Sequence, residues 1–61
     1  MIPKYKHDEK VKFKCNNEIK EGNIYIIDEY GTFEQSEEVS YDIFVEKENT
    51  LYKHIRESLI T

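Results

Sequence analysis

Alternation of polar and apolar residues along this chain predicts short β-strands. Residues 11–15 alternate strictly, with apolar side chains on one face and lysines on the other. Residues 39–46 alternate in the same way, and residues 51–55 follow a tight turn as the returning strand. A period of two is typical of a strand with one buried face, and no stretch has the period of a helix. The pattern therefore predicts an all-β protein.

The densest apolar run, residues 24–27, breaks this alternation. It reads Ile-Tyr-Ile-Ile and follows Gly22 closely. Four successive apolar side chains cannot all lie on one face of a flat strand. Either both faces are covered, or the strand bends so that Ile24 and Ile27 both reach the core. We expect the bend, because small barrels curl at such points and a nearby glycine favours it.

Polar residues separate the predicted strands. Asn16 and Asn17 lie between the first two strands, and Asn49 precedes the strand over residues 51–55. Asparagine tolerates the positive φ angles that tight turns require. Residues that follow this strand, 56–58, are expected to form one short 3₁₀ turn, and residues 59–61 a last short strand.

Sixty-one residues suffice for one domain. We expect a single five-stranded barrel over residues 1–61, with residues 1–9 as a loose lead-in and residues 28–38 as an acidic and aromatic loop. Closing the sheet into a barrel removes the edges that invite aggregation. The side chains expected to face inward are Val11, Phe13, Ile24, Ile27, Val39, Tyr41, Ile43, Val45, Leu51, Ile55 and Leu59.

Four motifs follow one another in a distinctive order. The first strand reads Lys10-Val11-Lys12-Phe13, and the second begins with Glu21-Gly22-Asn23-Ile24. Tyr41-Asp42-Ile43 comes after a variable loop, and residues 54–60 form a terminal turn and strand. This order, over residues 9–61, resembles the SH3-like small barrels of bacteria. The resemblance implies a fold but no particular function, because this barrel serves many unrelated roles.

The chain is also similar to short proteins of bacterial mobile elements and phages. Residue types with AT-rich codons, such as lysine, isoleucine and asparagine, are abundant in it. This composition agrees with an origin in an AT-rich bacterial or phage genome.

Charge is distributed unevenly along the chain, whose net charge is −4. Residues 1–20 carry six lysines and three acids, whereas residues 21–50 carry nine acids and one lysine. The simplest interpretation is a solvated surface of mixed charge, which small domains need. The alternative is a basic face and an acidic face with different partners.

Residues with catalytic or metal-binding chemistry are few and isolated. The one cysteine, Cys15, excludes an internal disulfide and a zinc site built from cysteines. His7 and His54 lack a partner at metal-ligand spacing, and the acids of residues 28–38 do not have the spacing of a calcium loop. Because no nucleophile is paired with a base, we expect no enzyme activity, no cofactor and no metal.

Aromatic residues are the main candidates for a binding site. The candidates do not belong to the inward set, and they are Tyr25, Tyr30, Phe33, Phe44 and Tyr52. In related barrels, exposed aromatics form a groove for peptides, a cage for a methylated cation or a platform for bases. The alternative role is structural. In that case Tyr30 and Phe33 plug one end of the barrel. Tyr25 then packs across strands on Phe44 or Tyr52.

These features leave three hypotheses for function. The first is protein–protein interaction, in which an aromatic surface rimmed by acids binds a basic segment of a partner. The second is nucleic-acid binding, which the acidic net charge disfavours. Its candidate face consists of Lys10, Lys12, Lys14 and Lys53. The third is an accessory or structural subunit. For all three we expect a monomer or a weak homodimer.

The sequence also bears on location in the cell. The N-terminus lacks the apolar run of a signal peptide, and the longest uninterrupted apolar run, residues 24–27, is far too short to span a membrane. A lone cysteine fits a reducing compartment. We therefore expect a cytoplasmic protein without membrane partners.

Overall fold

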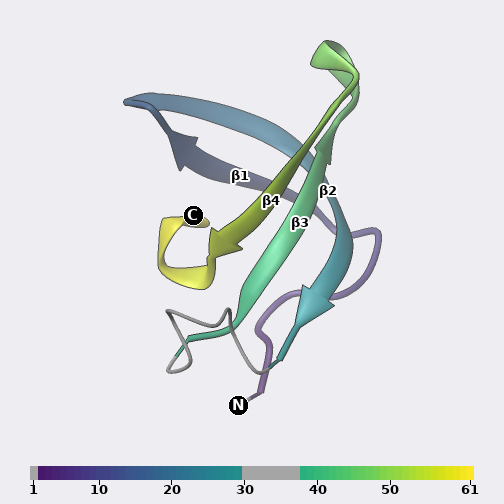
Figure 1. The fold of residues 1–61 in the computed structure, drawn as a ribbon, viewed down its shortest axis with the longest axis vertical. Helices are drawn as coiled ribbons and strands as arrows, with labels where there is room; N and C mark the ends of the chain where they lie inside the picture. The colour runs from purple at the N-terminus through teal and green to yellow at the C-terminus, as the bar shows by residue number, and fades with distance from the viewer. Residues whose placement is uncertain (1, 30–37) are drawn as a thin grey trace.

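The computed structural model describes residues 2–29 and 38–61, whose strands form one antiparallel sheet (Figure 1). The four strands are β1 (Lys10–Cys15), β2 (Glu18–Asp28), β3 (Ser40–Val45) and β4 (Thr50–Arg56). They lie in sequence order, so each strand pairs with the next. The only helical elements of the described residues are two 3₁₀ turns, η1 (Glu46–Glu48) and η2 (Glu57–Leu59). The prediction of an all-β protein is therefore confirmed.

Asparagines make the tight connections, as the sequence predicted. Cys15 pairs with Glu18, so Asn16 and Asn17 form a two-residue hairpin loop with φ angles of 50° and 65°. Positive φ at both positions matches the twist of the flanking strands. Asn49 ends η1 in the same left-handed region, with a φ of 52°. Asparagine visits this region at lower cost than most residues, because its short polar side chain can hydrogen-bond locally.

β2 is the longest strand and curves strongly across the molecule (Figure 1). Its pairing with β3 shifts register between Ile24 and Ile26, which leaves Tyr25 as the extra residue of a bulge. Ile24 is buried and Ile27 packs against the core, whereas Tyr25 and Ile26 are 53% and 52% exposed. The bend expected from the apolar run is thus present, and the bulge is its cause.

Gly22 allows β2 and β3 to approach each other closely. A Cβ atom at this position would lie 2.5 Å from the carbonyl oxygen of Phe44 and 2.8 Å from Cγ2 of Ile43. A backbone carbonyl cannot rotate away as a flexible side chain can. The glycine therefore serves the packing of the two strands where the sheet begins to curl.

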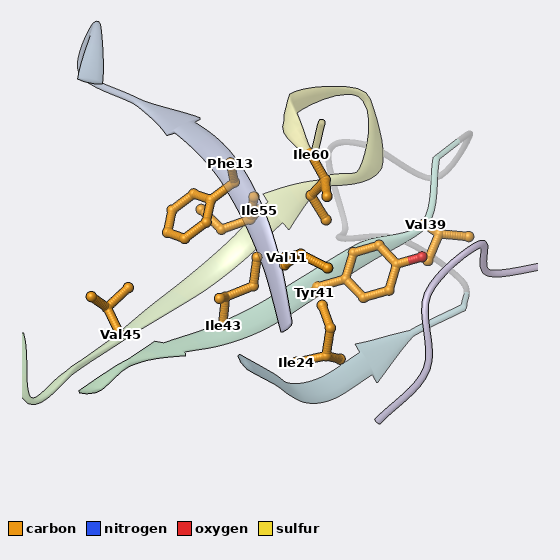
Figure 2. Packing of buried hydrophobic residues seen from close by; sticks show 9 residues of the cluster. All are labelled: Val11, Phe13, Ile24, Val39, Tyr41, Ile43, Val45, Ile55 and Ile60. Carbon is orange, nitrogen blue, oxygen red and sulfur yellow. The ribbon is translucent and has the colours of Figure 1, made fainter. Parts of the chain in front are cut away.

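Nine buried apolar side chains form the core of the described residues (Figure 2). They come from all four strands, from the residue before β3 and from the C-terminal segment. They are Val11, Phe13, Ile24, Val39, Tyr41, Ile43, Val45, Ile55 and Ile60. All but Ile60 belong to the set expected to face inward.

β4 departs from the predicted inward set. Leu51 lies opposite Phe44 on the outer face of the sheet, and Tyr52 instead packs against the core. Between Tyr52 and Ile55, β4 holds two residues where β3 holds only Asp42. This bulge shifts the alternation of side chains, so Tyr52 and Ile55 share the inner face. The expectations for Leu51 and Tyr52 assumed a regular strand and are wrong for this reason.

The C-terminal segment is the second departure. η2 ends at Leu59, one residue later than the predicted turn, so Ile60 rather than Leu59 is buried: their exposed fractions are 7% and 37%. Ile60 makes a single antiparallel bridge with Phe13, and the Thr61 N–H donates to the Lys12 carbonyl oxygen at 2.8 Å. The described residues thus form a four-stranded open sheet whose C-terminal segment touches β1.

The N-terminal segment lies against the sheet. The Asp8 N–H donates to the Ile24 carbonyl oxygen at 2.8 Å, and the Ile24 N–H donates to the Glu9 carbonyl oxygen at 2.9 Å. Nearer the N-terminus, the Tyr5 ring meets the Tyr41 ring edge-on, with centroids 5.7 Å apart. The two backbone bonds extend the pairing of β1 with β2 past Lys10, and the Tyr5 ring packs on Tyr41 of β3.

Candidate functional site

Tyr25 and Phe44 form an aromatic pair on the outer face of the sheet. Their ring centroids lie 5.9 Å apart, and the His7 ring lies 6.4 Å from that of Tyr25. The β2 bulge turns Tyr25 outward, and the alternation of β3 places Phe44 on the face opposite the buried Ile43. Tyr25 remains half exposed despite these contacts, so the pair is both held in position and accessible.

Apolar neighbours extend this pair into an outer patch, which consists of Tyr25, Ile26, Phe44 and Leu51. Leu51 pairs directly with Phe44, and Ile26 follows Tyr25 in β2. Tyr25 and Ile26 are exposed, whereas Phe44 and Leu51 are partly buried. A contiguous apolar patch on a small soluble protein is typical of an interaction site.

Three of the four candidate lysines share this face. Lys10, Lys12 and Lys14 are exposed along β1. Lys10 pairs with Asn23, which in turn pairs with Phe44, so the lysine row lies one strand away from the outer patch. Lys53 is exposed on β4, and two strands separate it from β1. The structure therefore brings together three members of the predicted basic face and leaves out the fourth.

Tyr52 is committed to a structural network instead. Its ring meets Phe13 edge-on at 5.6 Å, and its hydroxyl donates to the Glu48 carboxylate. Lys20 Nζ lies 2.6 Å from Glu48 Oε2 and 5.6 Å from the Tyr52 ring centroid. The hydrogen bonds from Lys20 and Tyr52 lower the pKa of Glu48, and the bond to Glu48 raises the pKa of Tyr52. Tyr52 thus links β4 to β1 and to η1, and it is not part of the outer patch.

A hollow of about 260 Å³ opens where the sheet bends, next to the outer patch. It is lined by Ile26, Ile27, Asp28, Glu29, Asp42 and His54. The backbone N–H of His54 donates to Asp42 Oδ1 at 3.1 Å. His54 has a φ of 58°, which is uncommon for a residue other than glycine, and the bond to Asp42 helps to hold this conformation. We call this feature the acidic hollow.

Sequence reasoning did not identify the acidic hollow. Asp42 and His54 lie twelve positions apart, and they meet because both strands next to β3 carry a bulge near Asp42. A bulge of this kind has no marker in the apolar pattern of β4, so the strand looks regular. The apolar run of β2 was the one sequence feature that pointed to this place.

The remaining candidate residues lie away from the outer patch or outside the described part of the chain. Tyr30 and Phe33 lie outside the described residues, as does most of the predicted loop over residues 28–38. Glu38, at the end of that range, accepts a hydrogen bond from the Ser58 N–H at 2.7 Å. Hydrogen bonding from the Ser58 side chain, and then from its backbone N–H, lowers the pKa of the Glu38 carboxyl. Cys15 is partly buried at the end of β1.

Two further findings concern the part of the chain that the structure describes. Within residues 2–29 and 38–61, no group of three or more histidine, cysteine or acidic side chains is placed to hold a metal ion. In the same ranges, no helix has the length and apolar character needed to cross a membrane.

This chain was compared with protein families, with curated proteins and with solved structures. No protein-family model, no curated protein and no solved structure matches this chain.

Proposed function

We propose that this chain is a small non-enzymatic binding module whose outer patch docks a segment of a protein partner. The observation that carries the proposal is the aromatic pair. Tyr25 is 53% exposed, yet its ring is supported by Phe44 at 5.9 Å and by His7 at 6.4 Å. A supported aromatic ring binds with little loss of side-chain entropy, and aromatic residues dominate the energetics of protein interfaces.

Charge favours a basic partner segment. The acidic hollow contributes three carboxylates at one end of the outer patch, and Asp42 lies on the same strand as Phe44. Complementary charge speeds association and rejects partners of the wrong sign. The opposite side of the patch carries charges of both signs, because a second hollow there is lined by both Lys10 and Glu21.

We also infer that the sheet closes as an SH3-like barrel, with the C-terminal segment acting as the fifth strand. Two contacts support this inference: the bridge between Phe13 and Ile60, and the hydrogen bond from Thr61 to Lys12. Closure on this side would cover the outer edge of β1, because its other edge already pairs with β2.

Peptide selection tests the binding proposal. Peptides selected from a random phage-display library on the immobilised protein are synthesised and measured by calorimetry. Tyr25→Ser should weaken their binding by about tenfold or more, the effect of losing an interface hot spot. Ile19→Ser is the matched control, because Ile19 is also exposed on β2, at 59%, but outside the patch. Peptides that bind both variants equally would contradict the proposal.

Nucleic-acid binding is a second candidate, which the row of exposed lysines on β1 favours. Across the sheet, only Asn23 of β2 lies between Lys10 and Phe44. A strand of nucleic acid could therefore contact the lysines while a base stacks on Tyr25. Fluorescence anisotropy with a labelled single-stranded oligonucleotide at low and high salt tests this candidate. It requires an affinity that falls with salt and with Lys12→Ala, but not with Lys53→Ala. Absence of binding at low salt would eliminate it.

A further inference from the structure

The acidic hollow has the dimensions and chemistry of a pocket for one side chain. Its volume of about 260 Å³ lies below the ~300–1,000 Å³ of pockets that hold drug-sized molecules. Two isoleucines and three carboxylates line it, with His54 as the sixth lining residue. An apolar wall beside several carboxylates fits a lysine or arginine, which packs its aliphatic stem on apolar surface and keeps its charged head at polar groups.

Asp42 is the best-positioned of these carboxylates. Its Oδ1 accepts the His54 N–H at 3.1 Å, so a backbone group fixes the orientation of the side chain. Asp42 pairs with Ile26, and the bulges of β2 and β4 lie next to it on either side. A carboxylate held by the backbone needs little reordering to accept a charged donor.

A buried hydroxyl lies nearby on the same strand. Ser40 is two residues before Asp42 on the same face of β3. It pairs with Asp28 of the neighbouring strand β2. Ser40 is 1% exposed, and its Oγ atom has no hydrogen-bond partner among the described residues. Leaving a buried hydroxyl unsatisfied is costly, so native proteins rarely do it without a ligand or solvent nearby. Ser40 does not line the acidic hollow, so its hydroxyl is an unsatisfied polar group beside the hollow rather than part of its wall.

We propose that the acidic hollow receives a lysine or arginine side chain of the partner segment while the rest of that segment lies on the outer patch. This inference rests on the proposed function and adds the partner's chemistry to it. Charge complementarity selects the occupant, because three acids face the hollow and His54 is the only lining residue able to become a cation.

Two small probes test the pocket directly. The ¹⁵N-labelled protein is titrated at low salt with N-acetyl-arginine methylamide and with its neutral isostere, N-acetyl-citrulline methylamide. The arginine probe should shift the amides of Ile26–Glu29, Asp42 and His54, and the citrulline probe should not. Asp42→Asn should weaken the arginine response about tenfold, because it removes one charge-assisted hydrogen bond. Equal responses to the two probes, or none, would overturn the proposal.

The variants are chosen so that the fold survives. Asn in place of Asp42 retains an oxygen that can accept the His54 N–H. Glu21→Gln is the matched control, since it neutralises an exposed acid of β2 that does not line the acidic hollow. An arginine response that falls equally in both variants would reflect general electrostatics and would overturn a specific pocket.

The outcome also separates this inference from the proposed function. If selected peptides lose binding with Tyr25→Ser but not with Asp42→Asn, the outer patch binds a partner and the basic-side-chain pocket is wrong. If the arginine probe titrates the hollow while no selected peptide depends on Tyr25, the outer-patch proposal is wrong and the hollow stands as a guanidinium site.

Discussion

Tyr41 and Glu57 join the core of this protein to its C-terminal turn through a hydrogen bond of 2.6 Å. Tyr41 is completely buried on β3, and its hydroxyl reaches the Oε2 atom of Glu57 in η2. The same oxygen accepts the backbone N–H of Lys4 at 3.0 Å. One carboxylate oxygen therefore links the central strand, the C-terminal turn and the N-terminal segment.

Replacing Tyr41 with phenylalanine should destabilise the fold while preserving its shape. The variant keeps the ring but removes the donor to Glu57, a hydrogen bond to a charged group that is worth about 1.5–3 kcal/mol. Urea denaturation should show this loss in the free energy of unfolding. Tyr52→Phe offers a comparison, because the Tyr52 hydroxyl also donates to a carboxylate but at an exposed site. An unchanged midpoint for Tyr41→Phe would contradict the linking role of the hydroxyl.

Ionisation of Tyr41 should make the folded protein less stable at alkaline pH. Burial and the bond to Glu57 raise the pKa of Tyr41 above its ordinary value. A group whose pKa is raised in the folded state contributes stability that is complete below its unfolded pKa of about 10, and this contribution is lost as the pH rises further. Thermal melts from pH 8 to pH 12 should therefore fall less steeply above about pH 10 for Tyr41→Phe than for the natural chain. Parallel curves for the two proteins would show that Tyr41 is not responsible.

Gly22→Ala tests the close approach of β2 and β3. The added methyl group would lie 2.5 Å from the Phe44 carbonyl oxygen, so one strand must move. Overpacking of this kind costs about 1–3 kcal/mol, a large part of the stability of so small a domain. Circular dichroism should record a lower melting temperature, whereas Glu21→Ala, at the exposed position beside it, should melt close to the natural chain. A melting temperature for Gly22→Ala equal to that of the natural chain would contradict the observed register.

Neighbouring residues at the C-terminus distinguish the observed core from the predicted one. Ile60 is 7% exposed and Leu59 is 37% exposed. Ile60→Ala should therefore cost about 2–5 kcal/mol, and Leu59→Ala about 0.5 kcal/mol or somewhat more, on denaturation. The reverse order would place Leu59 in the core and would shift η2 back by one residue.

The regular strands were predictable because burial on one face imposes a period of two. Val11 and Phe13 are buried while Lys12 and Lys14 are exposed, as the alternation requires. The loop formed by Asn16 and Asn17 was predictable because asparagine is one of the few residues that accept the positive φ of a tight turn. In such segments local sequence and tertiary burial point to the same structure.

The bulges mark the limit of this reasoning. The apolar run in β2 revealed a bend, because its side chains could not all be buried on one flat face. The bulge in β4 left no such conflict, since Leu51 and Ile55 fit a regular strand equally well. Its position depends on pairing with β3 and on the bond between His54 and Asp42. The same limit applies to the site. The sequence predicted that Tyr25 and Phe44 lie outside the inward set, but the acidic hollow arises from pairing between strands.

Binding of a protein segment by the outer patch is tested most directly by an amide shift map of a selected peptide on the ¹⁵N-labelled protein. We expect shifts centred on Tyr25, Ile26 and Phe44 that continue toward Asp42 and leave Ile19 unchanged. Shifts confined to Lys10–Lys14, or to the hairpin around Ile19, would place binding elsewhere and contradict the claim.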